Sequence, residues 1–283
     1  MASGLAINVP ATFNRVLSDL SFIPDVRSEN LTYTGFYGGS LSESQVNSAN
    51  DTAGNVVEII GRNPERLTFD KGFFAFIGPG GDTATGGTGI RTEVKSDNLI
   101  TGGYPCTIAV AIRSIKKAEK EASRRLYPIM SFFTNPWGTP AVAQPALLLS
   151  ATILDTGQHI LSAWSGRLGG ANSDALVSRC SVPVDWSSTD DVICAAISRA
   201  ADGRINMAVK KGLDSVLTST FGFPVQTPPA SSTATRILFG TSESRTLDSG
   251  DILMGQYWHN TALTMSELQQ QVALIHLKAN SRL

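Results

Sequence analysis

Short segments in which apolar and polar residues alternate dominate the chain, and this period of two constrains the fold more than any other feature. The segment TIAVAIR at 107–113 places Ile108, Val110 and Ile112 on one side, as a half-buried strand does. The segment 191–199 is apolar on both sides, which is typical of a strand in the middle of a sandwich. Further strands are predicted at 56–60, 73–77, 129–133, 146–154, 160–164, 205–210, 236–239 and 252–258.

Glycine- and proline-rich connections separate these segments, for example at 76–89, 134–145 and 224–233. Many short strands joined by such connections predict an all-β fold, in the form of an antiparallel jelly-roll β-sandwich. The length of 283 residues is sufficient for one large core. We therefore expect a single β-sandwich at 46–283, preceded by an N-terminal arm at 1–45.

The expected arm contains one helical pattern, at 12–20. Its apolar residues fall on one face, which consists of Phe13, Val16, Leu17 and Leu20. Because a short isolated helix is only marginally stable in water, this face needs a surface to cover it. We expect the arm to attach the chain to a partner protein or to a second copy of itself, giving a homo-oligomer.

A stronger helical signal lies near the C-terminus. Thr264 and Glu267 have the spacing of a capping box, in which each side chain accepts a hydrogen bond from the other residue's backbone amide. Leu268, Val272 and Ile275 then form one apolar stripe. The sequence predicts a helix here that caps the sandwich. The charged segment 115–126 is interpreted as a solvated surface excursion between two strands.

Charge and cysteine content limit the partners and the compartment. The 23 Lys and Arg residues nearly balance the 24 Asp and Glu residues, so we expect no binding to nucleic acid. No apolar run is long enough for membrane insertion, and the N-terminus lacks the pattern of a secretion signal. The three cysteines, Cys106, Cys180 and Cys194, have no disulfide or metal spacing and are expected to be free thiols in a reducing cytoplasm.

The order of the segments resembles a known family. Residues 236–275 are similar to the closing part of concanavalin A-like lectin/glucanase jelly rolls, notably the laminin-G and pentraxin-like branch. Ala262-Leu263-Thr264 followed by Glu267-Leu268 matches the start of that family's terminal helix. Residues 107–113 resemble its central strand, although the aromatic positions are occupied by Cys106 and Ala111.

Two further segments extend this resemblance, which covers about residues 50–277. Trp186 with residues 192–196 is similar to one strand of the family, and residues 202–209 to the next. The chain as a whole resembles lectin-type proteins of tailed phages and prophages. This resemblance implies a virion protein that is made in the bacterial host cytoplasm and contacts other virion proteins.

Glycosidases of this family carry paired carboxylates in an E-x-D-x-x-E strand, and no glutamate of this chain begins that motif. No G-x-S-x-G elbow marks a nucleophile, although a Ser/His/Asp triad stays open. His159, His259 and His276 lack metal-ligand spacing. We therefore expect no enzymatic activity and no cofactor.

Asp82, in a glycine-rich loop, is the one calcium candidate, yet calcium takes six to eight oxygen ligands.

Aromatic rings stack on the C–H faces of sugars, so the tryptophans are candidate binding residues. Trp164, Trp186 and Trp258 lie in or beside predicted strands and are expected in the core. Trp137, with Asn135 nearby, lies in a Pro- and Gly-rich connection. We predict this pair to bind carbohydrate, in a non-enzymatic virion protein that attaches to cell-surface glycans. The alternatives are a polysaccharide depolymerase or esterase, and a cytosolic carbohydrate-binding module unrelated to phages.

Overall fold

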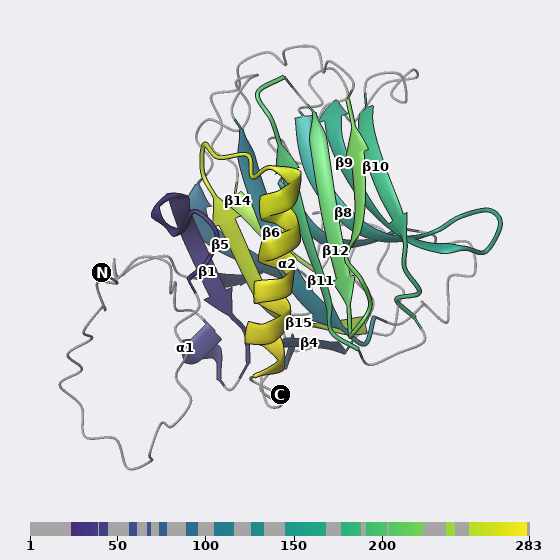
Figure 1. The fold of residues 1–283 in the computed structure, drawn as a ribbon. Coiled ribbons are helices and arrows are strands. Elements are labelled where there is room, and N and C mark those ends of the chain that lie inside the picture. The colour runs from purple at the N-terminus through teal and green to yellow at the C-terminus, as the bar shows by residue number, and fades with distance from the viewer. Residues whose placement is uncertain are drawn as a thin grey trace.

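Two antiparallel β-sheets pack face to face in the computed structural model of the chain, and one long helix covers the outside of the first sheet (Figure 1). The structure describes residues 24–38, 40–44, 57–60, 67–68, 74–77, 89–95, 105–115, 126–132, 145–167, 177–187, 191–202, 204–222, 236–240 and 249–281.

The first sheet has the strand order β13-β12-β11-β6-β15-β4-β3, and β1 also pairs with β15. One edge of β15 pairs first with β4 and then with β1. The other edge pairs with β6, and this pairing shifts register between Ile252 and Met254. The strands are β1 (Leu31–Phe36), β3 (Leu67–Thr68), β4 (Phe74–Ile77), β6 (Cys106–Arg113), β11 (Ile193–Arg199), β12 (Ile205–Lys211), β13 (Leu217–Phe221) and β15 (Ser249–Trp258).

The second sheet has the strand order β10-β9-β8-β7-β14-β5-β2. Its strands are β2 (Val57–Ile60), β5 (Gly89–Lys95), β7 (Leu126–Phe132), β8 (Pro145–Ile153), β9 (His159–Arg167), β10 (Val177–Pro183) and β14 (Arg236–Phe239). The helices are η1 (Ser28–Asn30), α1 (Leu41–Ser44) and α2 (Met265–Asn280).

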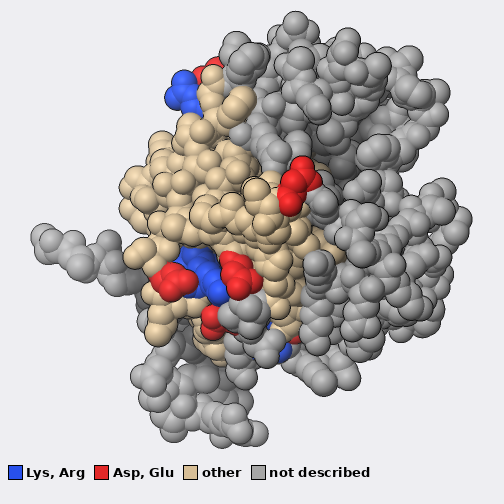
Figure 2. All heavy atoms as spheres, turned by 90° about the vertical axis from the view of Figure 1, so that its right-hand side faces the viewer, with Lys and Arg blue, Asp and Glu red and all other residues tan. Residues whose placement is uncertain are grey.

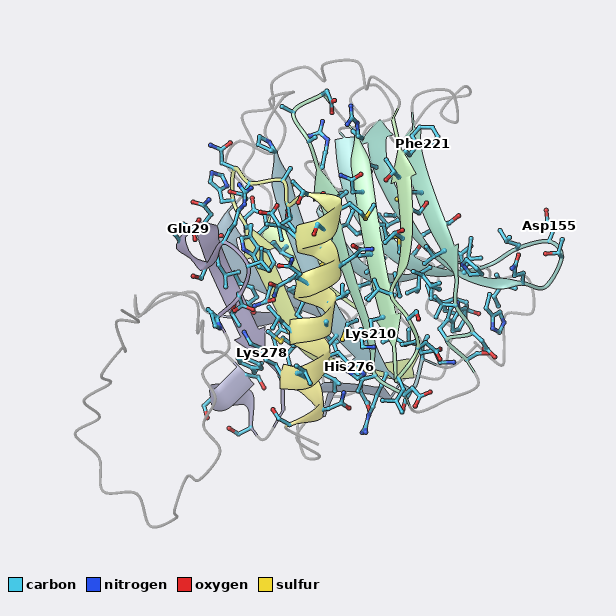
Figure 3. The ribbon with its side chains drawn as sticks, viewed as in Figure 1. Glu29, Asp155, Lys210, Phe221, His276 and Lys278 are labelled. Atoms are coloured by element: carbon cyan, nitrogen blue, oxygen red, sulfur yellow. The ribbon has the colours of Figure 1, made fainter. Side chains whose placement is uncertain are left out.

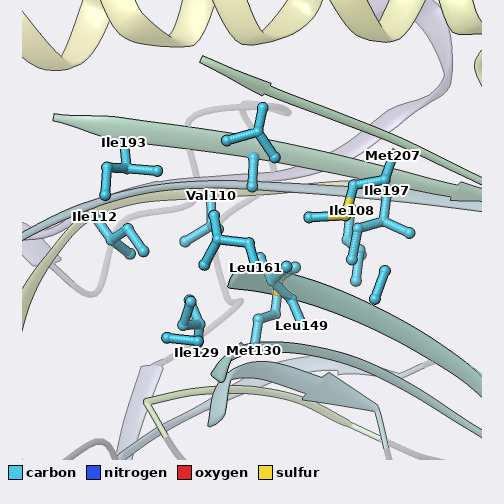
Figure 4. Packing of buried hydrophobic residues seen from close by; sticks show 14 of the residues in the cluster. Ile108, Val110, Ile112, Ile129, Met130, Leu149, Leu161, Ile193, Ile197 and Met207 are labelled. Carbon is cyan, nitrogen blue, oxygen red and sulfur yellow. The ribbon is translucent and has the colours of Figure 1, made fainter. Parts of the chain in front are cut away.

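The main core fills the space between the sheets, and it follows from the alternation in the sequence. Ile108, Val110 and Ile112 of β6 all face inward, as predicted, and are fully buried. Residues of the second sheet, among them Met130 and Leu149, meet them from the other side (Figure 4). Trp186 is also fully buried in this core, as predicted.

A second core lies between the first sheet and α2. The outward-facing residues of the central strands are small, which provides a flat surface for the helix; they are Ala109, Ala111, Cys194, Ala196 and Ala208. The residues of α2 that pack on this surface are those of the predicted apolar stripe, namely Leu268, Val272 and Ile275. The capping box is present, with Glu267 N donating to Thr264 Oγ1 at 3.3 Å and Thr264 N donating to Glu267 Oε2 at 2.7 Å.

Part of the expected arm belongs to the same sandwich. Strand β1 pairs with β15, and the residues just before it contact α2. Val26 N donates to Gln271 Oε1 at 2.9 Å, and Trp258 Nε1 donates to Val26 O at 2.9 Å. Arg27 Nε donates to Glu267 Oε1 at 2.6 Å. The described end of the arm is therefore held by its own sandwich.

Each strand predicted from the sequence is found, with small differences in its ends. The chain also has β1, β3, β5, β10 and β13, which the sequence analysis did not predict. The helix expected at 12–20 lies outside the described residues, as does most of the charged segment 115–126. Among the residues that the structure describes, no helix is long and apolar enough to cross a membrane.

Candidate functional site

The strand registers divide the sandwich into two ends. In the first sheet, Arg199 lies opposite Cys106 on one side and Ile205 on the other, and Ile205 lies opposite Phe221. We call this the Arg199 end; Figure 3 labels Phe221 there. The opposite end is the His159 end. There β10 finishes at Pro183 and only nine residues, 184–192, lead to β11 in the other sheet.

In the second sheet, the strand termini at the Arg199 end follow from the pairing. Lys95 lies opposite Arg236, and Pro145 lies opposite Arg167. Connections that begin and finish at the Arg199 end join β5 to β6, β7 to β8, β9 to β10, β11 to β12 and β13 to β14. Strands of both sheets therefore supply connections to the Arg199 end.

Arg199 is the last residue of β11, and its side chain lies between the two sheets. It lies on the same inward-facing side of the strand as Ile193, Ala195 and Ile197, and it is only 4% exposed. Its Nε atom is buried and has no hydrogen-bond partner. A guanidinium stays protonated in proteins, so the core of the sandwich holds a positive charge at this end.

The polar neighbours of Arg199 do not supply a negative charge. Burial raises the pKa of the Cys106 thiol to about 11, even though the Arg199 charge opposes that rise. The Cys106 thiol is therefore neutral at pH 7 and does not balance the charge of Arg199.

Polar side chains of the described residues continue outward from this buried group. Tyr257 Oη and His259 Nδ1 are 3.1 Å apart, and His259 is partly exposed. On the neighbouring strands, Thr220 Oγ1 donates to Asn206 Oδ1 at 3.0 Å on the exposed surface. Hydroxyl, amide and imidazole groups of this kind form hydrogen bonds with sugar hydroxyls.

The residues predicted from the sequence to form a site lie outside the described residues; they are Trp137, Asn135, Asp82, Phe13, Val16, Leu17 and Leu20. The strands on either side of two of them are described. The connection that carries Trp137 and Asn135 joins β7 to β8 at the Arg199 end. The connection that carries Asp82 joins β4 to β5 at the His159 end. The predicted sugar site and the calcium candidate therefore belong to connections at opposite ends.

At the His159 end, the structure brings a serine, a histidine and an aspartate together. Ser187 Oγ lies 2.9 Å from His159 Nδ1, and Asp185 Oδ1 lies 3.3 Å from the same nitrogen. A catalytic triad needs the acid on one ring nitrogen and the hydroxyl on the other. This cluster therefore lacks the geometry of a triad, and the His159 ring instead stacks on Trp186 with centroids 4.7 Å apart.

Within the described residues, no group of three or more His, Cys, Asp or Glu side chains is placed to hold a metal ion. The three cysteines are free thiols and buried, as predicted. The face shown in Figure 2 is largely uncharged where it is described, with its few Lys and Arg side chains close to Asp and Glu. The chemistry that these residues offer is hydrogen bonding, apart from the buried charge of Arg199.

Comparisons with known proteins support the fold assignment. A scan against protein-family models found no match, and a search of curated proteins found none. Solved structures do match. The binding domain of botulinum neurotoxin serotype C1 is 11% identical with a TM-score of 0.51, covering 90% of this chain and 53% of that one. The receptor-binding domain of botulinum neurotoxin type G is 12% identical with a TM-score of 0.50, covering 87% and 51%.

The fold is an antiparallel jelly-roll β-sandwich, and these toxin domains share it. The predicted all-β sandwich with a C-terminal helix is thus confirmed. A legume lectin-like domain from Entamoeba histolytica also matches, at 12% identity and a TM-score of 0.44, over 72% of this chain and 89% of that one. The chain spans about half the length of the toxin domains. Identities this low show a shared fold alone.

Arg199 was missed by the sequence analysis, although a signal for it was present. The alternation that places Ile193, Ala195 and Ile197 inward also places the next odd-numbered residue inward. The strand at 191–199 was predicted from its apolar residues, and no separate prediction was made for Arg199. Continuing the alternation from Ile197 to the next odd-numbered position places Arg199 on the inner face of the strand.

Proposed function

We propose that the chain is a non-enzymatic, carbohydrate-binding protein that uses the Arg199 end to bind glycans. The observation that carries this proposal is that the connection bearing Trp137 and Asn135 leaves the sandwich at the same end as hydrogen-bonding side chains of the first sheet. Loops held by a rigid scaffold commonly carry binding residues. Hydroxyl and amide groups on the adjoining described strands suit hydrogen bonding to sugar hydroxyls.

The absence of catalysis is part of the proposal. The sequence lacks the paired carboxylates of the family's glycosidases, and the Ser187, His159 and Asp185 cluster has the wrong geometry for acyl transfer. Each sugar contact is then worth about 1 kcal/mol for a ring stacked on an aromatic side chain. Adhesion with such weak sites requires several copies on one particle, where linkage raises the overall affinity by about 10²–10⁴.

We further propose that the particle is the virion of a tailed phage, assembled in the bacterial host cytoplasm. The resemblance of the sequence to lectin-type phage proteins supports this setting. In this setting the role proposed for residues 1–23, which precede the anchored segment at Asp25 and Val26 in the sequence, is attachment to other virion proteins or sister subunits. Mass spectrometry of purified virions tests this part, since the chain must be present at a fixed copy number per particle.

A glycan array, probed with the full-length protein in its assembled form, tests the binding proposal. We expect binding to a defined set of glycans and no release of reducing ends when those glycans are incubated with the protein. Release of reducing ends would show a depolymerase and contradict the non-enzymatic part. Absence of binding to bacterial surface glycans of every class would contradict the carbohydrate-binding part.

A further inference from the structure

The inference concerns the buried charge of Arg199 and rests on the proposed carbohydrate-binding function. Among the described residues, the ion pairs of the other arginines and lysines are formed with acidic side chains: Arg27 with Glu267, Arg113 with Asp251, Arg204 with Asp202, and Lys278 with Asp25. No acidic side chain of the described chain forms an ion pair with Arg199, although Arg199 is the most deeply buried of these cations.

A buried, uncompensated charge is costly, because the guanidinium loses its hydration and gains nothing in return. The cost is not offset by the neighbouring Cys106, since burial keeps its thiol neutral at pH 7. An apolar residue at position 199 would complete the inward row of Ile193, Ala195 and Ile197 without this cost. The guanidinium is therefore poorly explained by stability alone.

We propose that Arg199 binds the carboxylate of an acidic sugar, so that the Arg199 end recognises uronic-acid-type glycans rather than neutral ones. A guanidinium presents a planar fork of N–H donors that matches the two oxygens of a carboxylate. The Nε atom of Arg199 has no partner but is buried, so the carboxylate meets the guanidinium at its outer N–H groups, at the end of the sandwich where the Trp137 connection begins. Charge balance then comes from the ligand.

Methyl glucuronide and methyl glucoside form a matched probe pair, because they differ only in the carboxylate. We expect isothermal titration calorimetry with the full-length protein to show binding of the glucuronide at least about tenfold tighter than that of the glucoside. Arg199→Met removes the charge and should abolish this preference. Arg199→Lys keeps the positive charge but lacks the planar pair of N–H donors. This variant should retain only part of the preference for the glucuronide.

Arg204→Met is the control variant, because Arg204 lies in the hairpin that follows β11 but is exposed and paired with Asp202. It should leave the preference for the glucuronide unchanged. Thermal unfolding checks that each variant folds. We expect the Tm of the Arg199→Met protein without ligand to be equal to or above that of the wild type, since an uncompensated buried charge has been replaced by an apolar chain.

Three results would overturn the inference. One is equal affinity of the wild type and Arg199→Met for the glucuronide. Another is equal affinity of the wild type for acetate and glucuronide, which would show a site for a bare carboxylate and not for a sugar. The third is binding of neutral glycans alone; in that case the proposed carbohydrate-binding function stands and only the acidic specificity fails. Absence of binding to any glycan contradicts both proposals.

Discussion

Asp25 accepts a hydrogen bond of 2.8 Å from the buried amide of Gln271, which joins the start of the described chain to its C-terminal helix. The same Gln271 Nε2 atom donates to Gln256 Oε1 of β15, also at 2.8 Å. Lys278 Nζ donates to Asp25 Oδ1 at 2.6 Å. The segment before β1 is therefore part of the structure that holds α2 on the first sheet.

Asp25→Ala tests this anchoring. The substitution leaves the Gln271 amide and the Lys278 ammonium without their shared acceptor, at a cost of about 1–3 kcal/mol in the free energy of unfolding. Thermal unfolding should show a Tm lower by several degrees. Asp202→Ala is the matched control, because the Asp202–Arg204 pair is more than half exposed on both sides and should contribute little. Equal Tm values for the two variants would refute the anchoring role.

Two truncations separate the anchored part of the arm from the rest. Deletion of residues 1–23 leaves Asp25, Val26 and Arg27 in place, so the Tm should stay that of the full chain. Deletion of residues 1–30 removes those contacts and should lower the Tm. If residues 1–23 carry the apolar face that joins subunits, both deletions yield monomers in light scattering. An unchanged oligomer after the shorter deletion would assign assembly to another surface.

The stability of the protein should fall as the pH falls below about 6.5, because of His276. Burial lowers the pKa of this imidazole below its ordinary value of 6.5, Lys210 lowers it further, and Asp191 opposes the shift. Figure 3 shows His276 and Lys210 close together in this view. Below pH 6.5 the unfolded chain binds the proton more readily than the folded chain, so protonation favours unfolding.

Urea unfolding at pH 7.5 and pH 5.5 measures this effect. The midpoint for the wild type should be lower at pH 5.5, and His276→Gln should reduce the difference between the two values. Hydrogen bonds from Thr264 and Arg27 hold the pKa of Glu267 below 4.5 against the opposing effect of burial, so that carboxylate loses its stabilising charge only at lower pH. A wild-type difference that persists in His276→Gln would exclude His276 as its source.

The thiols provide a simple test of the core. Burial raises the pKa of Cys180 to about 12, and the pKa of Cys194 is also raised by burial, so neither forms the reactive thiolate near pH 8. Together with Cys106 they should react slowly with a thiol reagent in the native state. Under denaturing, non-reducing conditions all three thiols should react. A count of one reactive thiol would reveal a disulfide and contradict the free cysteines of the structure.

The central strands were predictable because the residues on each of their two faces are apolar, as burial of that face requires. Strands β6 and β11 are covered on both faces, by the other sheet and by α2, so both of their faces are apolar. The edge strand β13 was not predicted, because most of its residues, in the sequence LTSTF, are exposed and carry no apolar alternation. Strand β1 was missed because Thr34 faces the amide of Gln256 rather than an apolar layer.

The candidate site was less predictable than the fold. Trp137 was chosen for its residue type and its place in a connection, and the pairing of β7 with β8 now assigns that connection to the Arg199 end. The pairing of strands distant in sequence decides which connections meet, and local patterns do not contain that information. His276 lies in the last turns of α2, where a cation would suit the helix dipole, but its burial favours the neutral form instead.

Adhesion of the assembled protein to host cells, measured for wild type, Trp137→Ala and Leu213→Ala, tests the central claim most directly. Leu213 is the matched control, because it is 100% exposed and lies in the turn between β12 and β13 at the His159 end. The account predicts that Trp137→Ala abolishes adhesion while its Tm is unchanged, and that Leu213→Ala adheres as the wild type does. Wild-type adhesion by Trp137→Ala, or a large fall in its Tm, would contradict glycan recognition by Trp137 at the Arg199 end.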